Sequence, residues 1–243
     1  MTTFFLMTAL VIVLIGLSKG GLGGTLAALA TPLMTLVLPA PQAVGFLLPI
    51  LMIADIFALF AHWKRWDNKL VLLLLPGAVV GVAIGTFFLA SISADMLRKF
   101  IGVIILMFVT YRVFETRIQQ SIHYTARNWH GLVAGGAGAI ASTLAHNGPP
   151  PVAIYLLMQN IPPRTFVATM VLFFAVLNWI KVPSYFFAGL FDFKLLAQVA
   201  WLLPLLPVSV WLGKNMTVKL DKAIFEQVII VVLGVSAIFL LVS

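Results

Sequence analysis

The 243-residue sequence contains no cysteine, and only 9% of its residues are charged. The first absence excludes disulfide bonds and thiolate metal ligands. The second excludes an ordinary soluble domain, in which about a quarter of the residues carry a charge. HExxH, GxSxG and Walker motifs are also missing, and no two acidic residues lie close together in the apolar segments. We therefore expect neither an enzyme nor a bound metal or cofactor.

Long apolar runs dominate the sequence instead. Hydrophobic residues make up 62% of the chain, and several runs approach or exceed the roughly 20 residues that cross a bilayer as a helix. The runs lack the two-residue alternation of barrel strands, which predicts an all-α polytopic membrane protein. Six segments are typical of ordinary spans: about 43–62, 69–90, 97–114, 165–188, 195–213 and 224–242.

Two further apolar segments are interrupted at their centres. The first, 4–37, contains the stretch GLSKGGLGGTLAALATP (16–32), in which Lys19 and several glycines break the apolar run at 18–24. The second, about 131–158, is broken by His146, Asn147, Gly148 and three prolines. Each arm of the first segment has about 14 residues, a length typical of re-entrant segments. We predict that both segments are broken or re-entrant helices.

The two halves of the chain share a pattern. The sequence GGLG (20–23) corresponds to GGAG (135–138), and DNKL (67–70) corresponds to DFKL (192–195), each of which opens the next helix. The prolines at 41 and 76 correspond to those at 163 and 204. Each repeat thus consists of a broken helix followed by three transmembrane helices. We assign 1–114 to the first membrane repeat, 115–130 to a cytoplasmic linker and 131–243 to the second repeat, within one membrane domain.

Counting membrane crossings predicts that the two repeats are inverted. A broken segment that re-enters, or that crosses twice, returns the chain to the side on which it entered. Each repeat then crosses the membrane an odd number of further times, so the second repeat begins on the opposite side from the first. This topology places ten Lys and Arg residues on the cytoplasmic side, in 61–70, 111–130, 159–165 and 213–223, and three outside. Cytoplasmic loops collect positive charge, so we predict a plasma (inner) membrane protein with both termini outside. The same rule explains the net charge of +8 without a nucleic-acid partner.

The first break has the composition of an anion site. Irregular backbone inside a membrane is tolerated only against protein or a water-filled cavity, and paired breaks in inverted halves indicate a transporter's substrate site. The glycines free backbone N–H groups and Lys19 adds positive charge, which favours an anion. The alternatives are close helix packing for the glycines and snorkelling of Lys19 to an interface. The candidate ligands are Lys19, Gly20, Gly21, Gly23, Gly24 and Thr25, which begins the next helical arm.

Two charged residues lie deep in predicted spans. Asp55 and Lys181 are central in apolar segments, and charges at such depth usually face a cavity or a partner. Asn178 lies one turn before Lys181 and aligns approximately with Asp55 across the repeats. Asp55 is a candidate proton carrier. The alternative is a static ion pair between Asp55 and a lysine that only holds the bundle together.

The second break supplies the remaining candidates. His146 and Asn147 can donate hydrogen bonds to an anion, and histidine also titrates near neutral pH. His146 could equally serve to satisfy carbonyl groups that the break leaves free. Together with the first break, the predicted anion site includes His146, Asn147, Gly148, Asn178 and Lys181.

These motifs resemble the sulfite exporter TauE/SafE family of membrane transporters over nearly the whole chain. The likeness rests on SKGGLGGTLAALATPLM (18–34), PQAVGFLLP (41–49), the basic loop that follows them, and GLVAGGAGAIASTLAHNGPPPVAIYLL (131–157). The resemblance implies transport of small anionic sulfur or carbon compounds, such as sulfite or sulfonates like sulfoacetate, with coupling to the proton gradient. The residues that match the family's pattern are Lys19 and the glycines of the first break and residues 146–149 of the second, and the resemblance implies that these residues belong to the functional site.

We therefore predict a secondary active transporter of small anions, of sulfite or organosulfonates in particular, driven by the proton gradient. The alternatives are a passive anion channel and a carrier of non-sulfur organic acids. A non-transporting membrane subunit is disfavoured because the loops are short. The expected partners are the anion, protons and the lipid bilayer, with a homodimer as one option and no nucleic acid.

Overall fold

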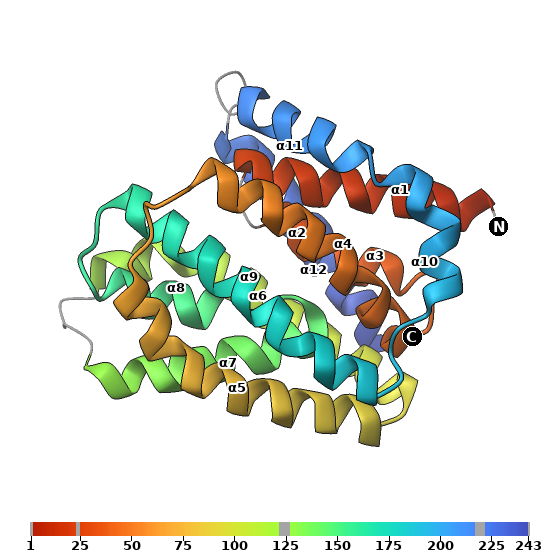
Figure 1. Cartoon of the computed structure of the whole chain (residues 1–243), viewed down its shortest axis with the longest axis horizontal. Helices are drawn as coiled ribbons and strands as arrows, with labels where there is room; N and C mark the ends of the chain where they lie inside the picture. The colour runs from red at the N-terminus through yellow and green to blue at the C-terminus, as the bar shows by residue number, and fades with distance from the viewer. Residues whose placement is uncertain (1, 23–24, 122–126, 217–221, 243) are drawn as a thin grey trace.

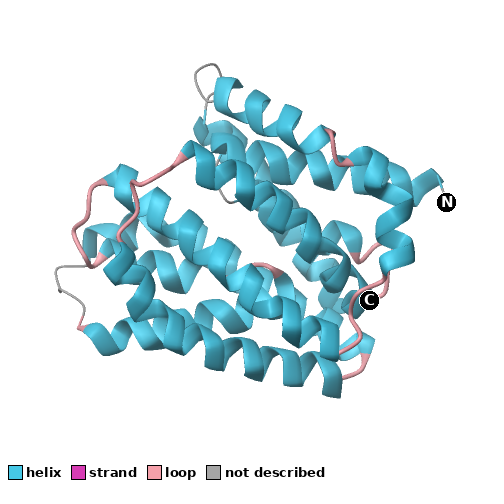
Figure 2. Cartoon of the chain, in the orientation of Figure 1, coloured by secondary structure: helices cyan, strands magenta, loops and turns pink. Residues whose placement is uncertain are grey.

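Helices form all of the regular structure in the computed structural model, which describes residues 2–22, 25–121, 127–216 and 222–242 (Figure 2). The all-α prediction is confirmed for these residues. In chain order the helices are α1 (Thr2–Leu17), a π-helical turn (Ser18–Leu22), α2 (Thr25–Ala28), α3 (Ala30–Met34), α4 (Ala40–Ala61), α5 (Asn68–Ser91), α6 (Ala94–Ser121), α7 (Asn128–Ala145), α8 (Pro149–Leu157), α9 (Pro163–Phe187), α10 (Phe193–Val199), a 3₁₀ turn (Ala200–Leu202), α11 (Leu205–Met216) and α12 (Lys222–Val242).

Several of these helices can cross a membrane. Among the described residues, four are long and apolar enough: α1 extended to Gly20, α4, α5 and α9. A bent pair, Phe193–Leu202 with Leu205–Gly213, makes a fifth if it counts as one span. α6 has 28 residues, with charged residues near both ends of its apolar centre. The chain is therefore a multi-pass membrane protein. α1 is also longer than the arm predicted for a re-entrant segment.

The span predicted at 195–213 is wrong in one respect, because it is not a single straight helix. Its two parts meet at an angle of 58°, and a 3₁₀ turn at Ala200–Leu202 precedes the bend. Proline has no backbone N–H and disrupts a helix interior. Pro204 and Pro207 remove two donors within one turn here, whereas Pro76, the counterpart of Pro204, stands alone inside the continuous helix α5.

Close backbone contacts join helices from the two halves of the chain. α5 packs against α7, and α1 packs against α11 (Figure 1). A Cβ atom on Gly77 would lie 1.9 Å from the carbonyl oxygen of Leu132, and one on Gly20 would lie 2.2 Å from that of Val210. Only glycine allows the helices to approach this closely, as is common where membrane helices meet.

Two aspartates cap the helices that follow the matching loops. The Asp67 carboxylate accepts hydrogen bonds from the backbone N–H groups of Lys69 at 2.8 Å and Leu70 at 3.1 Å. The Asp192 carboxylate accepts one from the backbone N–H of Leu195 at 2.9 Å. These bonds satisfy donors that a helix start leaves without partners. The predicted helix starts at DNKL and DFKL are thus confirmed.

Candidate functional site

Both predicted breaks are present in the structure. α1 ends at Leu17 and continues as a π-helical turn, and α2 begins at Thr25, as predicted. Gly23 and Gly24 lie outside the described residues. α7 ends at Ala145, and His146 follows in the left-handed backbone conformation with φ 53°. Few residues other than glycine adopt that conformation, and at this position it turns the chain from α7 towards α8.

The second break contacts the helical arm that follows the first break. The Thr31 hydroxyl in α3 donates a hydrogen bond to the carbonyl oxygen of Ala145 at 2.7 Å. The Asn147 side-chain amide donates one to the carbonyl oxygen of Ala28 at 3.4 Å. Segments that are more than a hundred residues apart in sequence are therefore joined here by side-chain hydrogen bonds.

A chain of polar side chains crosses the bundle beside this region. Lys19 forms an ion pair with one carboxylate oxygen of Asp55, and the Asn178 amide donates a hydrogen bond to the other oxygen at 2.7 Å. The Lys181 ammonium donates to the Asn178 amide oxygen at 3.1 Å and to the Ser142 hydroxyl at 2.7 Å. The structure thus brings Lys19, Asp55, Asn178 and Lys181 together, and Asp55 and Asn178, aligned across the repeats, are in direct contact.

Lys181 and its neighbours also complete the end of α7. The last four carbonyl groups of a helix have no partner within the helix. The Ser142 carbonyl accepts from Lys181 at 3.0 Å in addition to the backbone N–H of His146, the Thr143 carbonyl accepts from the Tyr185 hydroxyl at 2.6 Å, and the Ala145 carbonyl accepts from Thr31 as described above. A positive charge at a helix C-terminus is favourable. Lys181 is fully buried, and its ammonium group donates to three acceptors. It therefore does not line the adjacent cavity itself, and it holds Ser142 and Asn178, which do line that cavity, in place.

A cavity of about 390 Å³ opens onto this region, a size typical of small-molecule sites. Four predicted site residues line it: Lys19, His146, Asn147 and Asn178. From Asn178 the lining follows one face of α9 through Phe174, Met170 and Phe166, and it reaches His62, Tyr111, Arg112 and Glu115 where α4 and α6 end. The cavity therefore connects the centre of the bundle with the end where α9 begins. Asp55 and Lys181 lie behind the lining.

The mouth of the cavity carries its own ion pair. Arg112 pairs with Glu115, which also accepts a hydrogen bond from the Tyr111 hydroxyl at 3.1 Å. Burial and, to a smaller extent, the positive charge of Arg65 hold the pKa of His62 below its usual value of 6.5. His62 is therefore neutral at neutral pH. The positive charge that an entering anion can use is concentrated deeper in the cavity.

The charges at the inner end of the cavity do not balance. Two lysines, Lys19 and Lys181, meet one carboxylate, Asp55, so the formal net charge of the three side chains is +1. Buried charges are costly unless they are compensated. An anion of single charge in the cavity would neutralise this centre.

The second break offers few backbone N–H donors to an anion. α8 begins with Pro149 and two further prolines, which have no N–H group. Its N-terminus can therefore offer an anion its dipole but not the usual N–H donors. Gly148 packs closely, since a Cβ atom there would lie 2.2 Å from the Gly138 carbonyl oxygen. Gly148 and Gly20 thus pack closely against neighbouring backbone. Gly21 lies in the π-helical turn, and the side chain of Thr25 lies outside the described part of the structure.

Sequence reasoning missed several cavity residues. Ser142 is one turn before His146 and binds Lys181, but a lone serine in an apolar helix gives little signal. Arg112 was counted with the positive charge of the cytoplasmic segments and Glu115 was assigned to the linker 115–130, although both lie in α6 and line the cavity. Their spacing of three residues in YRVFE, which puts them on one helix face, was the available clue.

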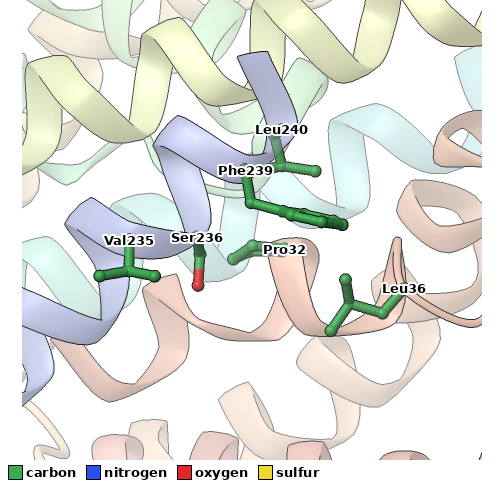
Figure 3. A pocket seen from close by; sticks show the side chains of 6 residues that line it. All are labelled: Pro32, Leu36, Val235, Ser236, Phe239 and Leu240. Atoms are coloured by element: carbon green, nitrogen blue, oxygen red, sulfur yellow. The ribbon is translucent and has the colours of Figure 1, made fainter. Parts of the chain in front are cut away.

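A second crevice does not offer an anion site. It has a volume of about 300 Å³, lies between α3 and α12, and is lined by Pro32, Leu36, Val235, Ser236, Phe239 and Leu240 (Figure 3). Its one polar side chain, Ser236, donates its hydroxyl to the carbonyl oxygen of Val232 at 2.8 Å. The crevice therefore presents an apolar surface.

Comparison with known proteins gives one match. The family described as sulfite exporter TauE/SafE matches residues 8–240, which is nearly the whole chain. No curated protein and no solved structure matches.

Proposed function

This chain belongs to the sulfite exporter TauE/SafE family of membrane transporters, and from that premise we propose that it is a secondary active transporter of sulfite or a small organosulfonate, coupled to the proton gradient. Transporters of sulfur-containing anions, not enzymes, make up this family. The substrate, the coupling ion and the site are the parts that we propose.

One observation carries the proposal: a cavity that ends at a buried network in which two lysines meet a single carboxylate. Lys19 lines the cavity and holds its ammonium group towards Asp55. Asn178 and Lys181 fix the other side of the carboxylate. A monovalent anion that reaches Lys19 would gain a charge-assisted hydrogen bond and neutralise the centre.

The ion pair between Lys19 and Asp55 offers a route to proton coupling. While Asp55 is ionised, it competes with an anion for the Lys19 ammonium. A proton on Asp55 removes that competitor and raises the net charge of the centre from +1 to +2. Proton and anion would then bind cooperatively, which is the requirement for their joint transport. The static ion pair considered above predicts no such linkage.

The packing supports inverted repeats. α5 of the first half packs against α7 of the second, and α11 of the second half packs against α1 of the first. α4 packs against α9 and α6 against α12, which are counterparts in the two repeats. Such reciprocal pairing is expected of two repeats related by a pseudo-two-fold axis. With this topology the termini lie outside the plasma membrane, and the cavity opens towards the cytoplasmic side.

Transport into proteoliposomes tests the proposal. Radiolabelled sulfite uptake is measured with and without an imposed pH gradient, for the wild type, Lys19→Gln and the surface control Lys194→Gln. We expect uptake against a concentration gradient in the wild type and in the control, and about a tenfold or greater loss in Lys19→Gln. Uptake that Lys19→Gln leaves intact would contradict the anion site. Passive flux unaffected by the pH gradient, with single-channel conductance, would indicate a channel.

A further inference from the structure

We infer that the cavity contains an apolar subsite between its two polar ends, and that this subsite holds the hydrocarbon tail of an organic sulfonate whose charged group binds Lys19. The inference rests on the proposed anion site and specifies the class of its substrate. That class is the alkyl sulfonates with a short, unsubstituted tail, in preference to sulfite.

The polar residues that line the cavity form two groups, one at each end. Lys19 and Asn178 lie at the inner end, where both contact the buried carboxylate. Arg112 and Glu115 form the ion pair at the mouth. Asn178 and Phe166, which lies near the mouth, are twelve residues apart on α9, or about 18 Å along the helix axis. The charged centre and the mouth are therefore well separated.

The wall that α9 forms between these ends is apolar. Five residues of α9 line the cavity before Asn178, and none of them is polar: Phe166, Val167, Met170, Val171 and Phe174. Phe166, Met170 and Phe174 follow one another at intervals of four residues, so they lie on one face of the helix. Met170 and Phe174 are only half-buried. Protein therefore leaves part of this apolar surface uncovered.

Other helices add apolar side chains to the lining. Leu51 comes from α4, Phe108 from α6 and Ala153 from α8. Phe108 precedes Arg112 by four residues, so it lies on the same face of α6 and one helical turn further from the mouth. The cavity is thus lined by hydrocarbon as soon as the polar mouth is passed.

The size of the cavity exceeds what sulfite fills. A water molecule takes up about 30 Å³ in the liquid, so a cavity of about 390 Å³ has room for about 13 of them. Sulfite has only four heavy atoms. Bound at Lys19, it would leave the apolar wall in contact with water. A hydrocarbon tail would cover that wall, which the hydrophobic effect favours.

The charged network determines how such a substrate lies. Asp55 and Lys181 lie behind the lining, so the sulfonate group meets the end of the cavity at Lys19. The tail then points back along α9, towards Phe174 and Met170. A second charge on the tail would lie against an apolar wall, and an unpaired charge is costly to bury. The subsite therefore favours a monoanion with a plain tail over a dianion such as sulfoacetate.

A series of tail lengths tests the inference. The affinities of methane-, ethane-, propane- and butanesulfonate are measured by isothermal titration of the full-length purified protein, together with those of sulfite and sulfoacetate. Full burial of one methylene group strengthens binding about fourfold. Because the tail contacts the wall over only part of its surface, we expect a gain of about tenfold from methane- to butanesulfonate. Butanesulfonate should also bind more tightly than sulfite and sulfoacetate.

Two variants and one set of cations assign the gain to the subsite. Met170→Gln keeps the length of the side chain and makes the wall polar, so the gain should fall to about threefold or less while methanesulfonate affinity stays within about twofold of the wild type. Met96→Gln makes the same change at an exposed residue outside the cavity lining and should keep the full gain. The matching alkylammonium ions carry the same tails without the anion and should not bind.

The outcomes separate this inference from the proposed function. Affinity that does not rise with tail length, or sulfite that binds more tightly than butanesulfonate, would overturn the apolar subsite and leave the anion site intact. A full gain in Met170→Gln, or an equal gain among the alkylammonium ions, would overturn it as well. If Met170→Gln does not fold, the wild-type series and the cations still decide. Failure of every anion to bind would contradict the proposed function itself.

Discussion

Replacing Asp55 by asparagine separates the roles of the central carboxylate. The substitution keeps the shape of the side chain and removes its charge, which leaves Lys19 without its anionic partner. If Asp55 competes with the substrate for Lys19, the variant binds the anion more tightly than the wild type does. If Asp55 only holds the bundle together, the variant is destabilised and anion binding does not improve.

The size of the effect follows from the geometry. An anion in contact with Lys19 is separated from the Asp55 carboxylate by two hydrogen-bonding contacts of about 3 Å each, and hence by about 6 Å. At an effective dielectric constant of about 20, two unit negative charges at 6 Å repel each other by about 2.8 kcal/mol. Removing this repulsion would tighten binding by up to about 100-fold.

The assay is calorimetric titration of ethanesulfonate into wild type and Asp55→Asn at mildly acidic and at neutral pH. This ligand does not titrate in that range, so any pH dependence belongs to the protein. We expect Asp55→Asn to bind ethanesulfonate more tightly than the wild type does at both pH values, because the variant lacks the repelling carboxylate. In proteoliposomes, the variant should exchange anions but not concentrate them.

The control is Asp192→Asn, which removes the same charge outside the cavity. Asparagine can also cap a helix, so this variant should behave as the wild type does in all three measurements. Affinity in Asp55→Asn equal to or below the wild-type value at neutral pH would refute the competition between the carboxylate and the anion.

Three further predictions concern stability, measured as thermal unfolding in detergent. Lys181→Met should lower the free energy of unfolding by about 3 kcal/mol, because it takes the ammonium donor away from the Ser142 hydroxyl and the Asn178 amide oxygen; no loss would mean that these acceptors find another donor. Gly77→Ala should destabilise the protein by about 1–3 kcal/mol, because the added methyl group overpacks against α7. Gly234→Ala is the control and should have no such effect, because there is open space around Gly234. Equal effects of the two substitutions would contradict the close contact at Gly77. The hydrogen bond from the Leu195 N–H is the main cause that holds the pKa of Asp192 below its usual value. The stabilisation that this hydrogen bond provides is therefore present above the unfolded-state pKa of Asp192 and is lost as the pH falls through the lower folded-state pKa. Asp192→Ala should be less stable than the wild type at neutral pH and equally stable in acid. A difference in stability that stays constant with pH would count against the cap.

The sequence predicted the elements whose cause is local. Glycines and a lysine inside an apolar run, or HNGPPP inside another, are incompatible with a continuous membrane helix, and both breaks lie where those residues are. Helix starts at Asp67 and Asp192 were predicted for the same reason, since capping depends on residues within one turn. Asp55 and Asn178, which the sequence pattern aligns approximately, are in direct contact in the structure.

Features that depend on packing were not predictable from one sequence. The acceptor of His146 Nε2 is the backbone of Val44, a position whose side chain carries no signal for this contact. The bend after Ala200–Leu202 depends on how two nearby prolines act together, whereas a single proline leaves α5 continuous. Arg112 has the composition of a loop charge and only the tertiary structure brings it to the mouth of the cavity.

The contact between Asp55 and Asn178 suggests why duplicated halves of this site differ. Two aspartates in these positions would place two carboxylates in direct contact, and only one could be ionised. Two asparagines would leave Lys19 without an anionic partner. One acid and one amide avoid both problems, because the amide donates to the carboxylate at 2.7 Å and accepts from Lys181 at 3.1 Å. Under the proposed coupling, a site in which a single proton changes the charge would require unequal residues at the two positions that the sequence pattern aligns.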